Sequence, residues 1–213
     1  DFLYAAAAKR RRHGVSFESG VPTLSLWAPT AKSVALRLYA NGDVAAYEEH
    51  PMERQSDGSW TIEGDASWAD RSYVYDVEVY IPQTSVTKED ASQQSLADTV
   101  AHNLVTDPNS VGLTTDSKRS VVLDLDDPRY KPESWRANAA PVISNQAERS
   151  ILEMHVRDFS ATDATVPERL RGTYSAFSVK GSHGMAYLRE LARAGMNTIH
   201  LLPTYDFGSV PES

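Results

Sequence analysis

Residues 150–160 read SILEMHVRDFS, and this short run divides the chain into two parts with different patterns. Apolar side chains occupy its even positions, Leu152, Met154 and Val156, and charged or titratable ones its odd positions, Glu153, His155 and Arg157. A period of two predicts a strand with two unlike faces. Such a strand either leaves its charges in water or opens a (β/α)8 barrel, with its apolar face toward helices and its polar face in the lumen.

The residues that follow this strand favour the barrel. Residues 161–181 form a loop much longer than most strand-to-helix connections, and loops of this length tend to be functional. Ser182 is a good N-cap for a helix that runs through Ala194, with Gly195 just beyond its end. Residues 198–203 predict a second strand. Strand, helix and strand in this order form a βαβ unit, whose two strands are parallel.

Before residue 127 the chain reads as short strands with no helical period. Alternating or apolar runs cover residues 23–27, 33–39, 73–81 and 120–125. Turn sequences interrupt them, Asn-Gly-Asp at 41–43 and Ser-Asp-Gly at 56–58. The polar, aperiodic residues 83–98 are interpreted as a surface insertion. This pattern predicts an immunoglobulin-like antiparallel β-sandwich.

Four segments follow from these patterns. They are an N-terminal tail at 1–13, a β-sandwich module at 14–126, a connector at 127–149 and the βαβ unit at 150–213. The basic run at the end of the tail is interpreted as a solvated segment. Three prolines and mixed polar residues predict that the connector is extended.

Composition limits the class of protein. The 213 residues carry a formal net charge of −8, and 41% are hydrophobic, which indicates a globular chain of one or two domains. The acidic balance argues against nucleic-acid and anionic-membrane partners, and no apolar run is long enough to span a bilayer. No secretory signal is visible, although a leader could have been removed before Asp1. Without cysteine, disulfides and thiol catalysis are excluded.

Four sequence motifs resemble a known family of enzymes. LWAPTA at 26–31 resembles the N-terminal module of carbohydrate-binding family 48. HVRDFSATD at 155–163, RGTYSAF at 171–177 and AGMNTIHLLPTYDF at 194–207 resemble the opening of the catalytic barrel in type I pullulanases and limit dextrinases, which belong to glycoside hydrolase family 13. The chain departs from the family at its Asp-Pro-Tyr turn, which is Asp107-Pro108-Asn109, and the 83–98 insertion looks longer than usual.

The resemblance implies the fold and the reaction. The expected fold is a β-sandwich followed by the truncated start of a (β/α)8 TIM barrel. The expected reaction is hydrolysis of α-1,6-glucosidic linkages in pullulan, starch or limit dextrins by a retaining mechanism, which needs two carboxyl groups roughly 5–5.5 Å apart. The family carries them on later barrel strands. A barrel needs roughly 250 residues, so no catalytic residue is expected in this chain, which alone should be inactive.

The candidate substrate-binding residues fall into two groups. Tyr205 and Asp206 lie at the C-terminal end of the second predicted barrel strand, where such enzymes place their active sites. The alternative for Tyr205 is an aromatic side chain packed within a loop. The alternative for Asp206, and equally for Asp158, is a carboxylate that caps a loop. Glu153, His155, Arg157 and His200 are expected to form a mainly structural polar network.

The sandwich offers Trp60 and Trp68 as platforms on which glucose rings could stack, because Trp60 follows a turn and Trp68 lies in a polar loop. Burial of both rings in the core is the alternative. Trp27, within the Trp-Ala-Pro run, is expected in the core.

The remaining expectations concern ligands and partners. Six scattered histidines show no ligand spacing, so no metal site is predicted and no cofactor is expected. Calcium would suit the parent enzyme, but no run has the alternating carboxylates of a calcium loop. The expected partners are an α-glucan and the remainder of the barrel, because strand faces around Met154 and Leu201 would otherwise be exposed. The resemblance suggests a secreted bacterial or a plastidial protein. A non-catalytic α-glucan-binding module and a bare scaffold are the alternatives.

Overall fold

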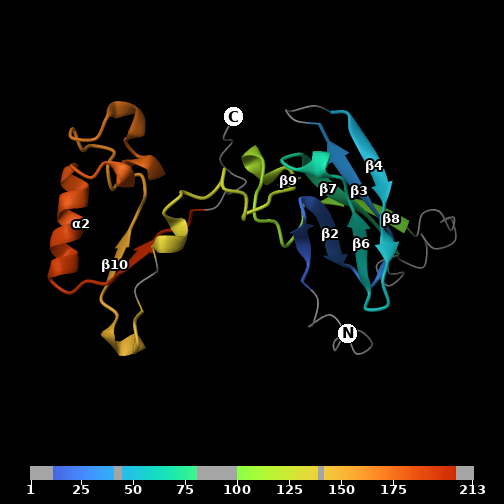
Figure 1. The fold of residues 1–213 in the computed structure, drawn as a ribbon, viewed down its shortest axis with the longest axis horizontal. Helices are drawn as coiled ribbons and strands as arrows, with labels where there is room; N and C mark the ends of the chain where they lie inside the picture. Colours follow the sequence, from blue (N-terminus) through green and yellow to red (C-terminus); the bar gives the residue numbers. More distant parts are fainter. Residues whose placement is uncertain (1–11, 41–44, 81–99, 139–141, 205–213) are drawn as a thin grey trace, which may run out of the picture. The chain divides into compact units, whose positions relative to one another are not determined.

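The computed structural model describes residues 12–40, 45–80, 100–138 and 142–204 (Figure 1). Its contacts divide the chain into two compact units, unit 1 at residues 1–133 and unit 2 at 134–207. The boundary falls within the proline-containing stretch 127–149. The turn expected at 41–43 and the insertion expected at 83–98 lie wholly outside the described residues.

Unit 1 consists of two antiparallel sheets. One has the order β1-β2-β6-β5, with β1 at Gly14–Glu18, β2 at Val21–Trp27, β6 at Ser59–Glu63 and β5 at Glu53–Arg54. The other has the order β4-β3-β7-β8, with β4 at Tyr47–Pro51, β3 at Ala31–Tyr39, β7 at Ser72–Tyr80 and β8 at Val100–Val105, and β9 at Ser120–Val121 also pairs with β7. Among the residues of unit 1 that the structure describes, two short segments are 3-10 helices, η1 at Ala66–Trp68 and η4 at Thr115–Ser117.

The core of unit 1 lies between the two sheets. Alternate residues of each strand point inward, so that Leu24 and Leu26 of β2 join Leu36 and Leu38 of β3 in one buried cluster. The predicted strands at 23–27 and 33–39 are confirmed. The strand predicted at 120–125 is wrong beyond Val121, because Asp124 begins a turn in which its carboxylate accepts the Asp126 amide (2.8 Å).

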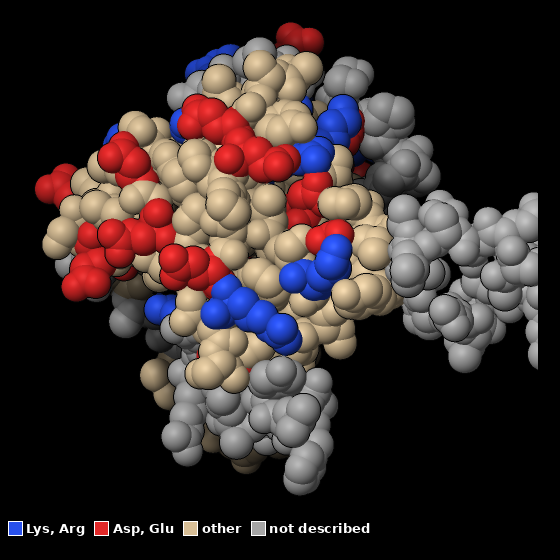
Figure 2. All heavy atoms as spheres, turned by 90° about the vertical axis from the view of Figure 1, so that its right-hand side faces the viewer, with Lys and Arg blue, Asp and Glu red and all other residues tan. Residues whose placement is uncertain are grey.

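The outer face of the five-stranded sheet carries paired charges. Lys32 lies 2.8 Å from Glu78, and Arg37 lies 3.0 Å from Glu49. Figure 2 shows basic side chains beside acidic ones on the side that faces right in Figure 1, with acidic clusters covering more of the surface. Ion pairs at an exposed surface contribute little to stability individually. They are consistent with a solvated face that has no excess of positive charge.

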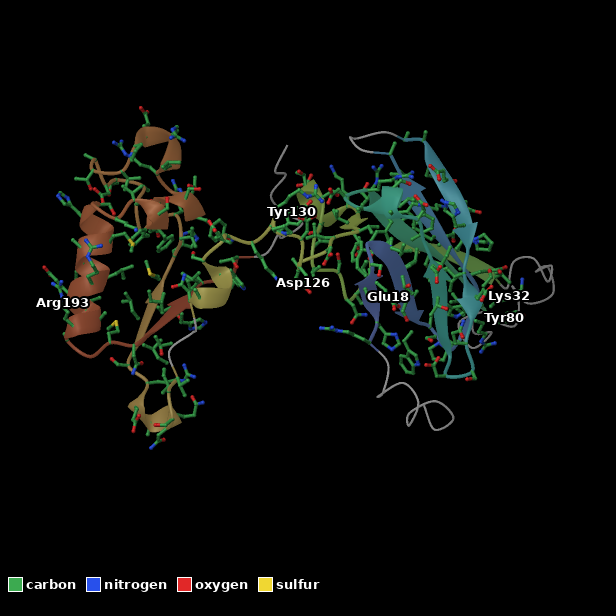
Figure 3. All side chains as sticks on the ribbon, viewed as in Figure 1. Glu18, Lys32, Tyr80, Asp126, Tyr130 and Arg193 are labelled. Carbon is green, nitrogen blue, oxygen red and sulfur yellow. The ribbon has the colours of Figure 1, made fainter. Side chains whose placement is uncertain are left out.

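The segment after β9 is held to unit 1 through Asp70. The carboxylate of Asp70 pairs with Arg129 (2.8 Å) and accepts a hydrogen bond from the hydroxyl of Tyr130, a residue labelled in Figure 3. These contacts, first the Tyr130 hydroxyl and then Arg129, hold the pKa of Asp70 below its usual range. Asp70 itself has a left-handed backbone (φ 66°).

A buried carboxylate organises the interior of unit 1. Asp107 accepts hydrogen bonds from the hydroxyls of Tyr73 (2.7 Å) and Tyr75 (3.2 Å), and both tyrosine side chains are fully buried. The Asp107 amide donates to the hydroxyl of Ser120 (2.8 Å), at the start of β9. Burial, followed by the charge of Asp107, raises the pKa of the Tyr73 hydroxyl. One side chain therefore satisfies the polar atoms of two core aromatics.

Unit 2 is a βαβ unit. Strands β10 at Ile151–Met154 and β11 at Thr198–Leu201 are parallel, with Leu152 beside Ile199, and α2 at His183–Arg193 connects them. Four short 3-10 helices flank or interrupt them, η5 at Trp135–Ala137, η6 at Gln146–Glu148, η7 at Glu168–Leu170 and η8 at Tyr174–Ser178.

The predicted helix is confirmed with both of its ends. The Ser182 hydroxyl accepts the Met185 amide (3.2 Å) as an N-cap, and Gly195 follows the helix in a left-handed conformation (φ 104°). Arg193 ends α2, as Figure 3 shows. Strand β10 is shorter than predicted, because residues 155–160 fold into turns, and β11 ends two residues before the predicted end. No helix in the described part of the chain is long and apolar enough to cross a membrane.

The long loop of unit 2 is fastened to the start of α2 by Asp163. One oxygen of its carboxylate accepts both the amide (2.9 Å) and the hydroxyl (2.5 Å) of Thr165, and the other accepts the Gly184 amide (3.1 Å). The Thr165 hydroxyl is the largest of the causes that lower the pKa of Asp163 to about 2. Phe159 and Phe177 stack under the same loop with ring centroids 4.1 Å apart.

Replacing Asp107 should destabilise unit 1 strongly. Asp107→Ala leaves two buried tyrosine hydroxyls without their acceptor, which should lower the free energy of unfolding by about 3 kcal/mol. Urea unfolding followed by far-ultraviolet circular dichroism measures the change. Glu18→Ala, at an exposed position of the same unit, is the control. Equal midpoints for the two variants would show that the Asp107 network is not a major source of stability.

The Asp163 fastening should weaken in acid. Its folded pKa of about 2 is below the ordinary value of 3.8, so its stabilising effect is present above about pH 4 and lost as the pH falls toward 2. The stability difference between the natural chain and Asp163→Asn should therefore shrink over this interval. Urea unfolding at several pH values measures it, with Asp158→Asn, 74% exposed, as the control. A difference independent of pH would contradict the assignment.

Candidate functional site

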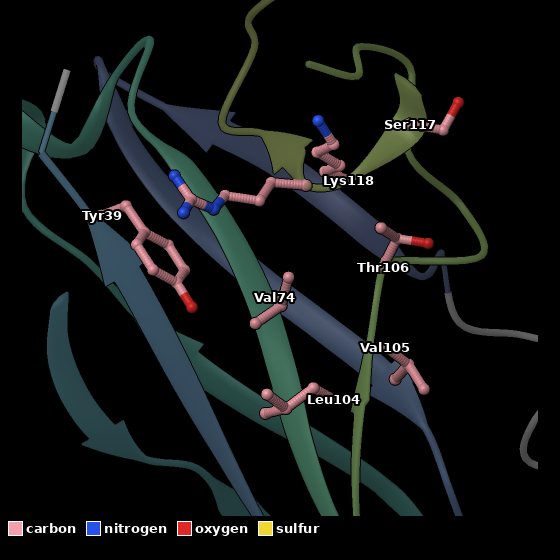
Figure 4. A pocket seen from close by; sticks show the side chains of 8 residues that line it. Tyr39, Val74, Leu104, Val105, Thr106, Ser117 and Lys118 are labelled. Carbon is pink, nitrogen blue, oxygen red and sulfur yellow. The ribbon is translucent and has the colours of Figure 1, made fainter. Parts of the chain in front are cut away.

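Unit 1 has a hollow of about 510 Å³ on the outer face of the five-stranded sheet (Figure 4). Strands β3, β7 and β8 form its floor, and the segment between η4 and β9 forms its rim. The residues that line it are Tyr39, Val74, Leu104, Val105, Thr106, Ser117, Lys118 and Arg119. The hollow thus combines an apolar floor with hydroxyl and cationic groups at its edge.

The rim is held over the floor by an aromatic contact. The guanidinium carbon of Arg119 lies 3.7 Å from the centre of the Tyr39 ring. The carbonyl oxygen of Tyr39 accepts a hydrogen bond from Arg71 (3.0 Å), and its ring packs against Tyr47 with centroids 5.6 Å apart. The Tyr39 ring is therefore fixed in position and only 8% exposed, so it supports the rim and leaves the apolar contact with a ligand to the floor.

The backbone of the rim has an unusual shape. Asp116 and Ser117 both have positive φ angles, 59° and 53°, in a region that non-glycine residues seldom adopt. Lys118 lies 3.0 Å from the carboxylate of Asp116. Strain of this kind occurs often at ligand sites and persists where the surroundings hold it.

The chemistry of the hollow suits binding and not catalysis. Leu104 exposes 55% of its surface on the floor, while Val74 beside it is buried. None of the residues that line the hollow in the described part of unit 1 is a carboxylate or an imidazole. It therefore offers apolar contact and hydrogen bonds to a ligand, without an acid–base pair.

Both predicted tryptophan platforms lie in the core in this structure. Trp60 is 6% exposed and donates its indole N–H to the carbonyl of Ala28 (2.9 Å). Trp68 is 7% exposed and packs on the ring of His50, with centroids 4.8 Å apart. Trp60 pairs with Leu26 across β2 and β6 and so shares its inward face. Both rings are therefore buried, which was the alternative to a platform. A sugar could not stack on either ring unless the surrounding residues moved away.

Trp27, which was expected in the core, is exposed instead. It occupies the last position of β2, next to the buried Leu26, and 39% of its surface is accessible. Its partner across the sheet is Ser59. The prediction was wrong because the face of this strand depends on its pairing with β6, which the sequence does not reveal.

The proposed cleft residues Tyr205 and Asp206 lie outside the described residues. The polar face predicted for unit 2 is present in part. Glu153 and His200 are neighbours on β10 and β11, with 3.2 Å between His200 Nδ1 and a carboxylate oxygen of Glu153. His155 lies 3.9 Å from Asp158. These contacts form two separate pairs on the C-terminal half of the chain.

The hollow around Tyr39 was not found by sequence reasoning. Its tyrosine and Arg119 are far apart in the sequence and meet only through the pairing of β7 with β9. Among the residues that the structure describes, no three His, Asp or Glu side chains gather as metal ligands.

Comparison with known proteins agrees with the predicted resemblance. Residues 12–109 match the model of carbohydrate-binding module 48, described as the isoamylase N-terminal domain. Pullulanase 1 of Arabidopsis thaliana, a chloroplastic protein, is 38% identical over 205 residues, which is 93% of this chain and 20% of the relative. Pullulanase of Klebsiella pneumoniae is 34% identical over 217 residues, covering 100% of this chain and 19% of the relative.

Solved structures show the same likeness. The structure of Klebsiella pneumoniae pullulanase complexed with maltotriose has a TM-score of 0.81 at 36% identity, covering 99% of this chain and 19% of that one. Pullulanase from Bacillus acidopullulyticus shares the fold, with a TM-score of 0.73 at 23% identity. The chain spans about a fifth of the length of the curated relatives that it matches. The resemblance predicted from the sequence motifs is thereby confirmed.

Proposed function

We propose that this chain is the N-terminal portion of a starch-debranching glycoside hydrolase that cleaves α-1,6-glucosidic linkages in pullulan, amylopectin or limit dextrins. One observation carries the proposal. The similarity to pullulanases covers 93% of the chain and 99% of its structure, and so extends through unit 2, well beyond the carbohydrate-binding match at 12–109. Similarity to these enzymes in the βαβ unit is not expected of a free-standing binding module.

In this proposal unit 2 opens the catalytic (β/α)8 barrel. The parallel strands β10 and β11 present the Glu153–His200 pair on one face, which suits a polar lumen. Ile199 and Leu201 lie on the other face and remain 46% and 37% exposed, as expected where further helices of a barrel would pack. The catalytic carboxylates would lie beyond this chain, roughly 5–5.5 Å apart for a retaining reaction, and Tyr205 and Asp206 would border the cleft.

In the same proposal unit 1, with the module assigned to 14–126 and the connector to 127–149, holds α-glucan in the hollow around Tyr39. The exposed side chain of Leu104 on the floor suits the apolar face of a glucose ring, while Thr106 and Lys118 suit its hydroxyls. A related pullulanase structure is a complex with maltotriose. If the chain acts without catalysis, as an α-glucan-binding module, this hollow is the feature that favours that second function.

Glucan binding should depend on Leu104. Leu104→Ala removes the exposed apolar floor of the hollow and should weaken binding of maltoheptaose about fivefold, as expected for the loss of one well-packed apolar contact. Isothermal titration calorimetry measures the affinity. Leu113→Ala is the matched control, since Leu113 is 49% exposed in the same unit but does not line the hollow. Equal losses in the two variants would reject the hollow as the site.

The parent activity is tested with pullulan, whose maltotriose units are joined by α-1,6 linkages. A longer polypeptide that continues this sequence should release maltotriose from pullulan, because it would carry the carboxylate pair that the reaction requires. The 213-residue chain alone should release no reducing sugar. Release of sugar by the purified chain, or a longer polypeptide that cleaves amylose but not pullulan, would contradict the proposal.

A further inference from the structure

The outer face of the β1-β2-β6-β5 sheet carries side chains of one chemical kind. Strand register places alternate residues on it, with Ser25 beside Thr61 and Thr23 beside Glu63. The opposite face, with Leu24, Leu26 and Trp60, is buried in the core. The outward strand positions are mostly serine, threonine and glutamate, and none of those that the structure describes is lysine or arginine.

Trp27 stands at one end of this face. Its indole N–H donates to the backbone carbonyl of Asp57 (3.3 Å), which limits rotation of the ring, and 39% of its surface stays accessible. The hairpin that supplies this carbonyl is itself braced, because the Asp57 carboxylate accepts both the amide (3.0 Å) and the hydroxyl (2.5 Å) of Ser59. The exposed ring is therefore held by a well-ordered turn.

Polar groups lie along the sheet beside the ring. Thr61 is diagonal to Trp27 across β2 and β6, and its hydroxyl accepts from the side-chain amide of Gln55 (2.8 Å). Thr23 and Glu63 lie four residues farther along their strands, roughly 13 Å away at the usual rise of a strand. Ser25 is covered, since its hydroxyl contacts His13 (3.1 Å). Because Ser25 lies between Trp27 and Thr23 on this face, Thr61 and Gln55 are the polar groups next to the ring, and Thr23 and Glu63 form a separate part of the face.

The exposed indole ring and the polar side chains beside it suit a neutral ligand that is rich in hydroxyl groups. An indole ring packs on the apolar C–H face of a pyranose, and hydroxyls and carboxylates exchange hydrogen bonds with the sugar hydroxyls around it. Glutamates without a basic neighbour on the strand positions would repel a phosphorylated or otherwise anionic ligand. The charge of the face therefore argues against nucleic acid and acidic polysaccharides.

We propose that Trp27 and the polar face beside it form a second α-glucan-binding surface, on the sheet opposite to the hollow around Tyr39. The choice of α-glucan rests on the function proposed above, while the site itself rests on the exposed ring and its neighbours. Two surfaces on one module would let a single branched glucan be held at two points, which raises the apparent affinity for polymers above that for short oligosaccharides.

Native gel electrophoresis of the whole chain through soluble glycogen tests the surface. Trp27→Ala should weaken retardation about tenfold, as for an aromatic anchor at the centre of a contact, and Trp27→Tyr should restore most of it. Combining Trp27→Ala with Leu104→Ala should abolish retardation. Trp135→Ala is the matched control, since Trp135 is 62% exposed in unit 2.

A fluorescence titration guards against effects on folding. Maltoheptaose should change the tryptophan emission of the natural chain, and Trp27→Phe, which keeps an aromatic ring, should lose that change, because Trp60 and Trp68 are buried. Retardation unchanged in Trp27→Ala but weakened in Leu104→Ala would overturn this surface and leave the proposed function standing. A natural chain that glycogen does not retard would overturn this surface and glucan binding by unit 1 together, while pullulan hydrolysis by the longer polypeptide would be judged separately.

Discussion

The hydrogen bonds that Asp107 accepts in the interior of unit 1 constrain everything around them. Two tyrosine hydroxyls on β7 would each be costly to bury without an acceptor, and one carboxylate oxygen serves both. The same residue binds Ser120 through its amide, so the start of β9 is positioned by the core. Because β9 follows directly after Arg119, this interior network also fixes the rim of the hollow over Tyr39. The shape of a surface site thus depends on polar atoms that never reach the surface.

The strength of the local signal decided what the sequence could predict. Helix α2 was predictable because Ser182 and Gly195 mark its two ends with side-chain and backbone chemistry that needs no distant partner. The strand at 33–39 was predictable from alternation alone. The early end of the strand at 120 was not, since the turn at Asp124 depends on one side chain competing for a backbone amide.

The three tryptophans of the sandwich show where such reasoning stops. Trp60 and Trp68 were candidate platforms because of the polar residues around them, with burial as the alternative, and β2–β6 pairing and the packing on His50 bury both. Trp27 is next to Leu26, and one of the two must face outward. Only the register with Ser59 settles which one does. The Tyr39–Arg119 contact is harder still to predict, because no local pattern links two residues so far apart in the sequence.

Both surfaces proposed for glucan are held in place before the ligand arrives. Tyr39 is held by the Arg119 contact and by its own carbonyl, and Trp27 by the carbonyl of Asp57. Ordering a free side chain on binding would cost part of the small gain from one sugar ring, so a fixed ring is the more effective platform. Because two sheets of a sandwich present opposite outer faces, a module with one such surface on each can contact separate branches of a glucan.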